Sequence, residues 1–429
     1  MKHLSLALTL ALALGGYPFM ASVLSLAGFT DSSTPSIIFR IVLSAMVFFT
    51  LLLNSDGIRV RHNPIFIIAF LVFWIGYLLR ILADGFFYQT AFSPHVTPNE
   101  ILASVFLFVL IPSLAGFVRL EPTTTKITQA LFYVLTLVTA VLLLIEARDA
   151  IEDLIARTNI RFALERLNPI TIGYVGGTLV VLSAINLYKR LTRFHIIRTV
   201  FFAASLLIGL FLVLLSASKG PAIATITCLV AYWLVPVRFP RLIAGAIVLF
   251  AIGIALTQTY NFIFKQFDLD QAERFVEAVE GESEGSVDAR KIAFSGAIQQ
   301  FYRSPVFGDA LFEESTGYYP HNLPIEAFLA TGILGGIAYL ACLYFAAISI
   351  LKLLYREDGN EWLALLALFF IIAAQFSGSH FSFGATWITL IAVITTSRSL
   401  QFNSSRKKRR RRRKVYYKKE PHIDEAQSV

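Results

Sequence analysis

Apolar stretches long enough to cross a bilayer recur from one end of the chain to the other, and polar segments separate them. A helix needs about 20 consecutive apolar residues to span the hydrocarbon core. About twelve stretches meet this requirement, so the pattern predicts an all-α fold, a polytopic membrane protein built as a helical bundle. The predicted spans are residues 4–28, 36–54, 64–82, 100–118, 127–147, 169–187, 196–216, 220–237, 240–260, 323–354, 361–376 and 380–397.

Basic residues concentrate in alternate connections between these spans, which sets the expected topology. Because lysine and arginine are retained on the cytoplasmic side, twelve spans place both termini in the cytoplasm of a bacterial inner membrane. The remaining connections, including the longest at 261–322, then face the exported side, which is the periplasm in a Gram-negative cell. The basic connections contain Arg59, Arg61, Arg119, Lys126, Lys189, Arg190, Arg193, Arg198, Arg238, Arg241, Lys352 and Arg356.

Composition agrees with this class and limits the chemistry. Hydrophobic residues make up 56% of the chain and charged residues 15%, against about a quarter charged in soluble domains. Both cysteines, Cys228 and Cys342, lie inside apolar runs, where thiols usually serve as inert packing groups. His and Cys form no cluster with metal-ligand spacing. The sequence therefore predicts no disulfide, no metal and no cofactor.

The two ends of the chain resemble targeting or binding segments but have simpler interpretations. Met1–Ala21 resembles a signal peptide, yet it continues apolar beyond Gly15, so we expect an uncleaved first span. The tail contains an unbroken basic run, Arg406–Lys414. Because it emerges directly from a span, we expect contact with anionic lipids, at about 1 kcal/mol per basic residue, and no binding of nucleic acid.

Two polar segments on the exported side should contain surface helices. Residues 148–168 carry mixed charges and read as an amphipathic helix lying on the membrane surface. Ser286–Tyr302 reads as a second one, with Phe294, Ala297 and Phe301 on its packed stripe and Gln300 off it. Arg290 shares that stripe, so it should point toward the protein and meet an anion there. The sequence Asp268-Leu-Asp270 resembles the metal motif of nucleotide-sugar transferases, but its acid-rich setting favours a solvated face.

Three features converge at the exported ends of the spans. Lys219 lies in the tight turn Ser216–Pro221, at the start of a helix. Arg290 comes from the loop, and His321 directly precedes Asn322, which can cap the next helix. Helix N-termini carry partial positive charge, so these groups predict an anion site with a histidine beside it.

Further polar residues near the same ends are candidates for substrate contact. Arg40 and Arg80 lie near the exported ends of the second and third spans, where intramembrane charge usually has a function and snorkelling is the alternative. His380 is a weaker candidate for an outward polar contact. Gly332 and Gly336 form a GxxxG pair, which predicts close helix packing rather than catalysis.

The spacing of these motifs resembles the O-antigen ligase family. His321-Asn322 is followed after nine residues by Gly332 and after two more by Gly335. The turn Ser216–Gly220 resembles the family's Ser-x-Ser-basic-Gly motif, and Arg290 with Ser304–Gly308 resembles its Arg…Pro-x-x-Gly stretch. The turn carries Lys219 where the family usually has arginine, which keeps the charge but loses bidentate phosphate binding.

The resemblance divides the chain into three parts. It is specific over about 210–340. It implies an N-terminal transmembrane bundle at 1–209, a ligase-like core at 210–397 that includes the partly helical loop 261–322, and a basic cytoplasmic tail at 398–429.

The resemblance also implies an activity, a metal-independent glycosyl transfer on the periplasmic face. The donor would be a glycan on undecaprenyl diphosphate, and the acceptor a sugar hydroxyl on lipid A–core. His321 would act as general base. Lys219 and Arg290 would bind the diphosphate, with Asn322, Arg40 and Arg80 as further substrate contacts.

Other functions remain open at this level. A polymerase that uses a lipid-linked repeat as acceptor would share the same site. A polysaccharide or lipid transporter would favour polar groups at mid-membrane and repeated halves, neither of which the sequence displays. A purely structural role as a membrane scaffold is a third alternative, but it would not explain the spacing of the motifs around His321.

Overall fold

The computed structural model describes residues 2–29, 33–58, 63–87, 96–156, 167–191, 196–235 and 286–398. Within these residues the chain is helical and has no β-strand. Eight helices are long and apolar enough to cross a membrane. The predicted all-α, polytopic membrane fold is therefore confirmed.

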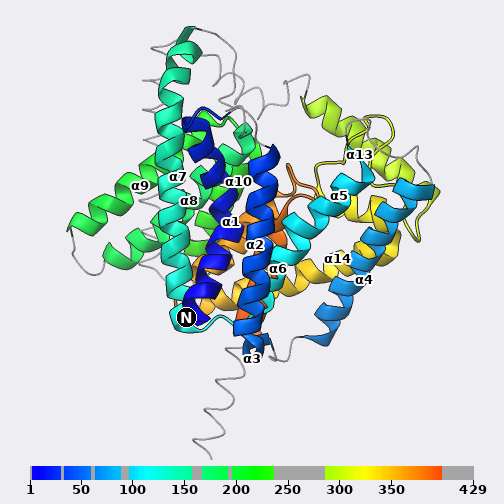
Figure 1. Cartoon of the computed structure of the whole chain (residues 1–429), viewed down its shortest axis with the longest axis horizontal. Coiled ribbons are helices and arrows are strands. Elements are labelled where there is room, and N and C mark those ends of the chain that lie inside the picture. Colours follow the sequence, from blue (N-terminus) through cyan, green and yellow to red (C-terminus); the bar gives the residue numbers. More distant parts are fainter. Residues whose placement is uncertain are drawn as a thin grey trace, which may run out of the picture.

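The first half of the chain contributes helices to both sides of the bundle in Figure 1, with α1, α2 and α7 toward the left and α4 at the right. α1 packs between α2 and α7, and α4 packs against α14 from the second half of the chain. The fourth span is broken, because π-helical and 3-10 turns interrupt it around Pro112. These elements are α1 (Lys2–Leu26), α2 (Ser33–Leu53), α3 (Ser55–Ile58), α4 (Pro64–Leu82), η1 (Ala83–Phe87), α5 (Pro98–Ser104), η2 (Val105–Leu110), α6 (Ile111–Leu114), η3 (Ala115–Phe117) and α7 (Pro122–Ala156).

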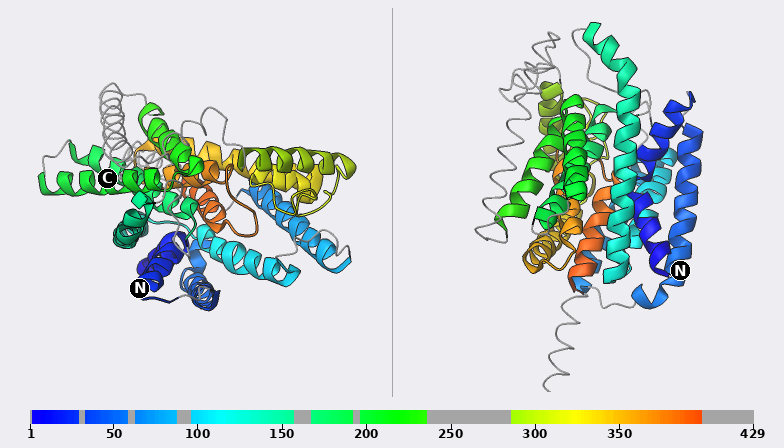
Figure 2. Two further views of the ribbon diagram at one scale, coloured as in Figure 1. Left: turned by 90° about the horizontal axis from the view of Figure 1, so that it is seen from above. Right: turned by 90° about the vertical axis from the view of Figure 1, so that its left-hand side faces the viewer.

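The second half supplies the helices that carry the predicted site. α8 packs against α9 and α10, and α10 packs against α15. The elements are α8 (Pro169–Leu191), α9 (Ile196–Leu215), α10 (Lys219–Leu234), α13 (Ser286–Arg303), α14 (Leu323–Arg356), α15 (Glu361–Ala373) and a last helix at 384–398. α13 lies at the end of the bundle opposite to the N-terminus and α3 (Figures 1 and 2).

Eleven of the twelve predicted spans correspond to helices in the described part of the chain. Three of these, α10, α15 and the helix at 384–398, are shorter than a full membrane crossing requires. The predicted span at 240–260, the acidic part of the long loop at 261–285 and the basic tail lie outside the described residues.

Two local predictions were wrong. Residues 148–156 do not begin a separate surface helix, because α7 runs without a break from Pro122 to Ala156 and extends beyond its neighbours (Figure 1). On α13, Ala293, Ala297 and Gln300 are buried, whereas Phe294 is only partly so. The packed stripe is therefore turned toward Gln300, whose amide group finds hydrogen-bond partners in the following loop.

An aromatic cluster fills the core between α4, α14 and the last helix. Phe73 stacks on Trp387 at 5.3 Å between ring centroids and lies 5.4 Å from Tyr339. All three side chains are fully buried. Cys228 and Cys342 are buried free thiols, as their apolar settings predict. This dense packing fixes the position of α14, whose N-terminus carries His321.

Candidate active site at the ends of α10 and α14

The loop 304–322 that leads to His321 is held in shape by buried polar groups. The Glu313 carboxylate accepts four hydrogen bonds, from the backbone N–H and hydroxyl groups of Ser315 and Thr316. These bonds outweigh the opposing effect of burial and lower the pKa of Glu313. Gln300 on α13 accepts from the N–H of Glu314 at 2.9 Å. The loop is therefore a defined structure on which His321 can be positioned.

Arg80 holds the beginning of this loop rather than contacting substrate. Its Nε donates to the carbonyl of Ala330 at 3.1 Å, and its two terminal nitrogens donate to the Asp84 carboxylate and to three loop carbonyls. Those carbonyls belong to Phe307, Gly308 and Asp309. A guanidinium has five N–H donors, and five bonds use all of them. The predicted role of Arg80 in substrate binding is therefore replaced by a structural one.

Gly332 also has a different role from the predicted helix–helix contact. Its φ of 62° and ψ of −159° interrupt α14. A Cβ added there would lie 2.4 Å from the backbone of Val306, so it is the 304–309 loop that approaches. A Cβ on Gly308 would lie equally close to the Ala330 carbonyl carbon, and the N–H of Ile333 donates to the Pro305 carbonyl at 2.7 Å. The Pro-x-x-Gly segment thus docks its backbone into the break in α14.

His321 lies at the N-terminal end of α14 in a constrained position. Its φ is 53°, in the left-handed region that few non-glycine residues adopt. Asn322 caps α14, as predicted, by accepting from the N–H of Ile325 at 3.1 Å, and its amide donates to the Gln375 carbonyl. The ring of Tyr319 lies 4.3 Å from that of His321, centroid to centroid. The imidazole is thus oriented by its backbone, its neighbour and the cap.

The His321 ring is suited to accept a proton. It is half-buried, and its Nδ1 has no hydrogen-bond partner among the described residues. Burial, together with the positive charge of Arg290, lowers its pKa below the usual 6.5. A lowered pKa keeps the imidazole neutral at pH 7, which is the form a general base requires.

Lys219 and Arg290 line one pocket, as the sequence predicts. The pocket also contains Ser218 and Ser377. Ala217 has a φ of 42°, which closes the tight turn before α10. Ser218 occupies the N-cap position of α10, but its side chain makes no cap hydrogen bond. The backbone N–H groups of the first turn of α10 therefore lack this cap partner at the edge of the pocket. Two basic side chains and a helix N-terminus therefore line one pocket, and the charge of Arg290 also acts on His321, whose pKa it lowers.

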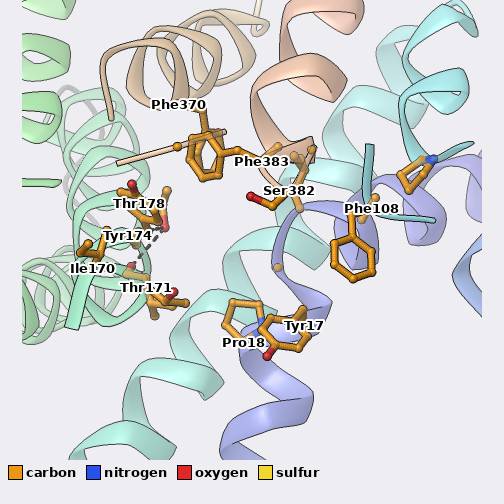
Figure 3. Close-up of a pocket in the computed structure, with 18 of the residues that line it drawn as sticks. Tyr17, Pro18, Phe108, Ile170, Thr171, Tyr174, Thr178, Phe370, Ser382 and Phe383 are labelled. Carbon is orange, nitrogen blue, oxygen red and sulfur yellow. Dashed lines mark hydrogen bonds between the residues drawn. The ribbon is translucent and has the colours of Figure 1, made fainter. Parts of the chain in front are cut away.

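Arg40 lies apart from that pocket, in a larger cavity. The cavity measures about 380 Å³, and its lining includes Tyr17, Phe108 and Tyr174 (Figure 3). Arg40 also lines it, and so does Tyr319, the residue that contacts His321. No sequence pattern singles out Tyr17, Phe108 or Tyr174, because each falls within an apolar span.

His380 does not face outward. It is fully buried among the rings of Phe73, Tyr77 and Tyr339, and its Nε2 lies 2.8 Å from the Leu323 carbonyl. Its backbone N–H donates to Glu326, which also accepts from the Tyr77 hydroxyl. His380 and Tyr77 therefore hold the first turn of α14 from inside the bundle, through their hydrogen bonds to Leu323 and Glu326.

No cluster of His, Cys, Asp or Glu within the described ranges could hold a metal ion. Asp268 and Asp270 lie outside these ranges.

Comparison with known proteins agrees with this geometry. The model of the family described as O-antigen ligase matches residues 204–340. No curated protein and no solved structure matches the chain. The matched range contains the turn before α10, α13, the docked loop, His321 and the break at Gly332. The match confirms the resemblance found in the sequence: residues 204–340 of this chain are similar to the O-antigen ligase family.

Proposed function

We propose that this protein transfers a glycan from undecaprenyl diphosphate to a sugar hydroxyl of lipid A–core, on the periplasmic face of the inner membrane. The observation that carries the proposal is the position of His321. An imidazole without a hydrogen-bond partner in the described structure lies beside Arg290, and Arg290 shares a pocket with Lys219 at the N-terminus of α10. A base and an anion site thus adjoin each other at one end of the bundle.

These residues can divide the chemistry between them. His321 removes the proton from the acceptor hydroxyl as its oxygen forms a bond to the anomeric carbon of the donor sugar. The bond from that carbon to the diphosphate oxygen breaks, and the lipid diphosphate leaves with the electron pair. Lys219, Arg290 and the helix N-terminus stabilise the charge that develops on the leaving group. Asn322 holds His321 in place through its cap and its bond to Gln375.

The nature of the donor follows from its location. Nucleotide sugars are made in the cytoplasm, so an enzyme that works on the exported side needs a sugar activated on a lipid. A diphosphate leaving group suits a site with fixed positive charge. The description of the matching family, O-antigen ligase, favours lipid A–core as acceptor.

Transfer by the purified protein in proteoliposomes tests the proposal. With a lipid-diphosphate glycan donor, His321→Ala should lower kcat by roughly 10²- to 10⁴-fold, the range expected for loss of a general base. Lys219→Gln should raise KM for the donor, by roughly ten- to a hundredfold for loss of a charged hydrogen bond. Arg198→Gln, at an exposed position of α9, is the matched control. Full activity of His321→Ala would refute the role of His321.

The acceptor can be identified from the surface glycan of a deletion strain. Free lipid A–core together with accumulated long lipid-linked polymer would support the ligase. Lipid A–core that carries a single repeat would instead indicate a polymerase, with the same site and a different acceptor.

A further inference from the structure

The cavity that contains Arg40 is lined mainly by apolar side chains, among which lie aromatic rings and hydrogen-bonding groups of the kinds that contact sugars. Its lining comes from the middle of α1, the first half of α2, the N-terminal half of α8 and the turn that precedes the last helix. Figure 3 shows Tyr17, Tyr174 and Ser382 among the lining residues. Tyr17, Tyr174 and Phe383 offer ring faces, and Asn168, Thr171 and Ser382 offer hydrogen-bonding groups. Its volume of about 380 Å³ is near the lower end of the range for ligand pockets, about 300–1,000 Å³. It can hold one or two sugar rings rather than a long polymer.

Among the described residues that line the cavity, Arg40 is the one that carries a charge. Its guanidinium carbon lies 3.1 Å from the ring centroid of Phe108 and 4.9 Å from that of Tyr17. Within the described part of the chain, Arg40 forms no ion pair and no hydrogen bond. A guanidinium in a membrane-spanning helix is costly without an anionic or polar partner, and two ring faces leave its N–H donors unused.

A lipid chain would fit the apolar part of this lining but would not explain its polar groups. An acyl or prenyl chain gains nothing from an arginine, an asparagine and several hydroxyl groups. A sugar ring can pack its C–H face against aromatic rings and exchange hydrogen bonds with the hydroxyl and amide groups. A carboxylate or phosphate on that sugar would complete the donors of Arg40 in a charge-assisted, bidentate contact.

We propose that this cavity is a subsite for an anionic sugar residue of the glycan substrate, with Arg40 pairing with its carboxylate or phosphate. The subsite adjoins the diphosphate pocket, because Ile170 and Ser377 line both. Tyr319 lines the cavity and also contacts the ring of His321. The inference rests on the proposed glycosyl transfer and adds a preference for acidic glycans. It separates the role of Arg40 from the diphosphate contact of Lys219 and Arg290.

Binding of small sugars to the purified protein tests the subsite without turnover. Saturation-transfer NMR in nanodiscs would compare methyl glucoside with methyl glucuronide and with methyl glucoside 6-phosphate. The wild type should bind at least one anionic sugar roughly tenfold or more tightly than the neutral one, since charged hydrogen bonds contribute most. Arg40→Gln should abolish that preference, Arg40→Lys should retain part of it, and Arg198→Gln should leave it unchanged. The two anionic probes separate carboxylate from phosphate.

Equal binding of all three sugars by the wild type would overturn the proposal, and so would a preference that survives Arg40→Gln. Failure of every sugar to bind would also overturn it and would leave lipid as the occupant. Arg40→Gln should unfold at the same temperature as the Arg198→Gln control. Equal stability would show that the loss of preference for anionic sugars does not come from unfolding.

Inhibition kinetics assign the subsite to one substrate. The anionic probe that binds should compete with the acceptor if the acidic sugar belongs to the acceptor, and with the donor if it belongs to the donor. Binding without inhibition would place the subsite outside the reaction and overturn the proposal. His321→Ala should bind the probe as the wild type does. If that variant also kept full transfer activity, the catalytic role of His321 would fail while the sugar subsite would stand.

Discussion

At the scale of single residues, the surroundings of His321 determine its protonation. Burial is the larger cause and the positive charge of Arg290 the smaller one; both disfavour the protonated imidazole and so lower the pKa of His321. Tyr319 beside it is shifted in the opposite sense, because burial and then the charge of Glu326 raise its pKa to about 12. The tyrosine therefore keeps its proton near neutral pH, where the His321 imidazole is neutral.

The pH dependence of transfer should reflect this environment. Activity needs neutral His321, so kcat/KM should be lost only as the pH falls below 6.5, through the lowered pKa. Arg290→Gln removes a positive neighbour, which should raise the pKa of His321 and move the acid limb to higher pH. Lys291→Gln, at an exposed position on the same helix, serves as control. An acid limb that stays in place in Arg290→Gln would show that this charge does not act on His321.

Arg80 illustrates a residue whose type suggests one role and whose contacts give another. Its partners are carbonyl groups some 220 to 250 positions later in the chain, so no local pattern could reveal them. An arginine near a membrane boundary reads as a substrate contact from sequence. The structure assigns all five donors to the protein itself.

Removing this clamp should affect stability before it affects substrate binding. Arg80→Ala leaves the fully buried Asp84 without its cationic partner, and breaking a buried ion pair costs about 3–5 kcal/mol. Arg80→Lys should not rescue it, because an ammonium cannot reproduce the planar arrangement of five donors. Thermal unfolding in detergent provides the measurement. A variant with unchanged stability and a raised KM would return Arg80 to the substrate site.

At the scale of elements, the helices were largely predictable and their interruptions were not. The length of each apolar run sets the position of a span, which is why α1, α4 and α9 lie where the sequence places them. The break in α14 depends on a loop backbone that arrives from elsewhere, so Gly332 reads as an ordinary packing glycine. The cavity around Arg40 draws its lining from several separate segments, which no periodicity connects.

The docking of the loop into α14 predicts a difference between two glycines. Gly332 and Gly317 both have positive φ, at 62° and 67°. Gly332→Ala would also force a Cβ onto the Val306 backbone, whereas Gly317 has open space around it. Gly317→Ala should cost about 1–2 kcal/mol from backbone strain alone, and Gly332→Ala should cost more and lower the yield of folded protein. Equal effects on the unfolding temperature would contradict the docked loop.

At the scale of the whole molecule, the site collects at one end of the bundle. The N-termini of α10 and α14 and the helix α13 contribute the basic groups and His321, while the N-terminus of the chain and α3 lie at the opposite end (Figure 2). A lipid-linked substrate could therefore keep its tail in the bilayer while its diphosphate reaches the pocket from the membrane surface.

The side of the membrane on which His321 lies decides whether a lipid-diphosphate donor can be its substrate. Tyr318 is exposed next to it, so Tyr318→Cys provides a reporter that leaves His321 intact, with Cys228 and Cys342 replaced by serine. We expect a membrane-impermeant maleimide to label this variant in cells whose inner membrane is intact. Labelling only after the inner membrane is permeabilised would place His321 in the cytoplasm and contradict the proposed transfer.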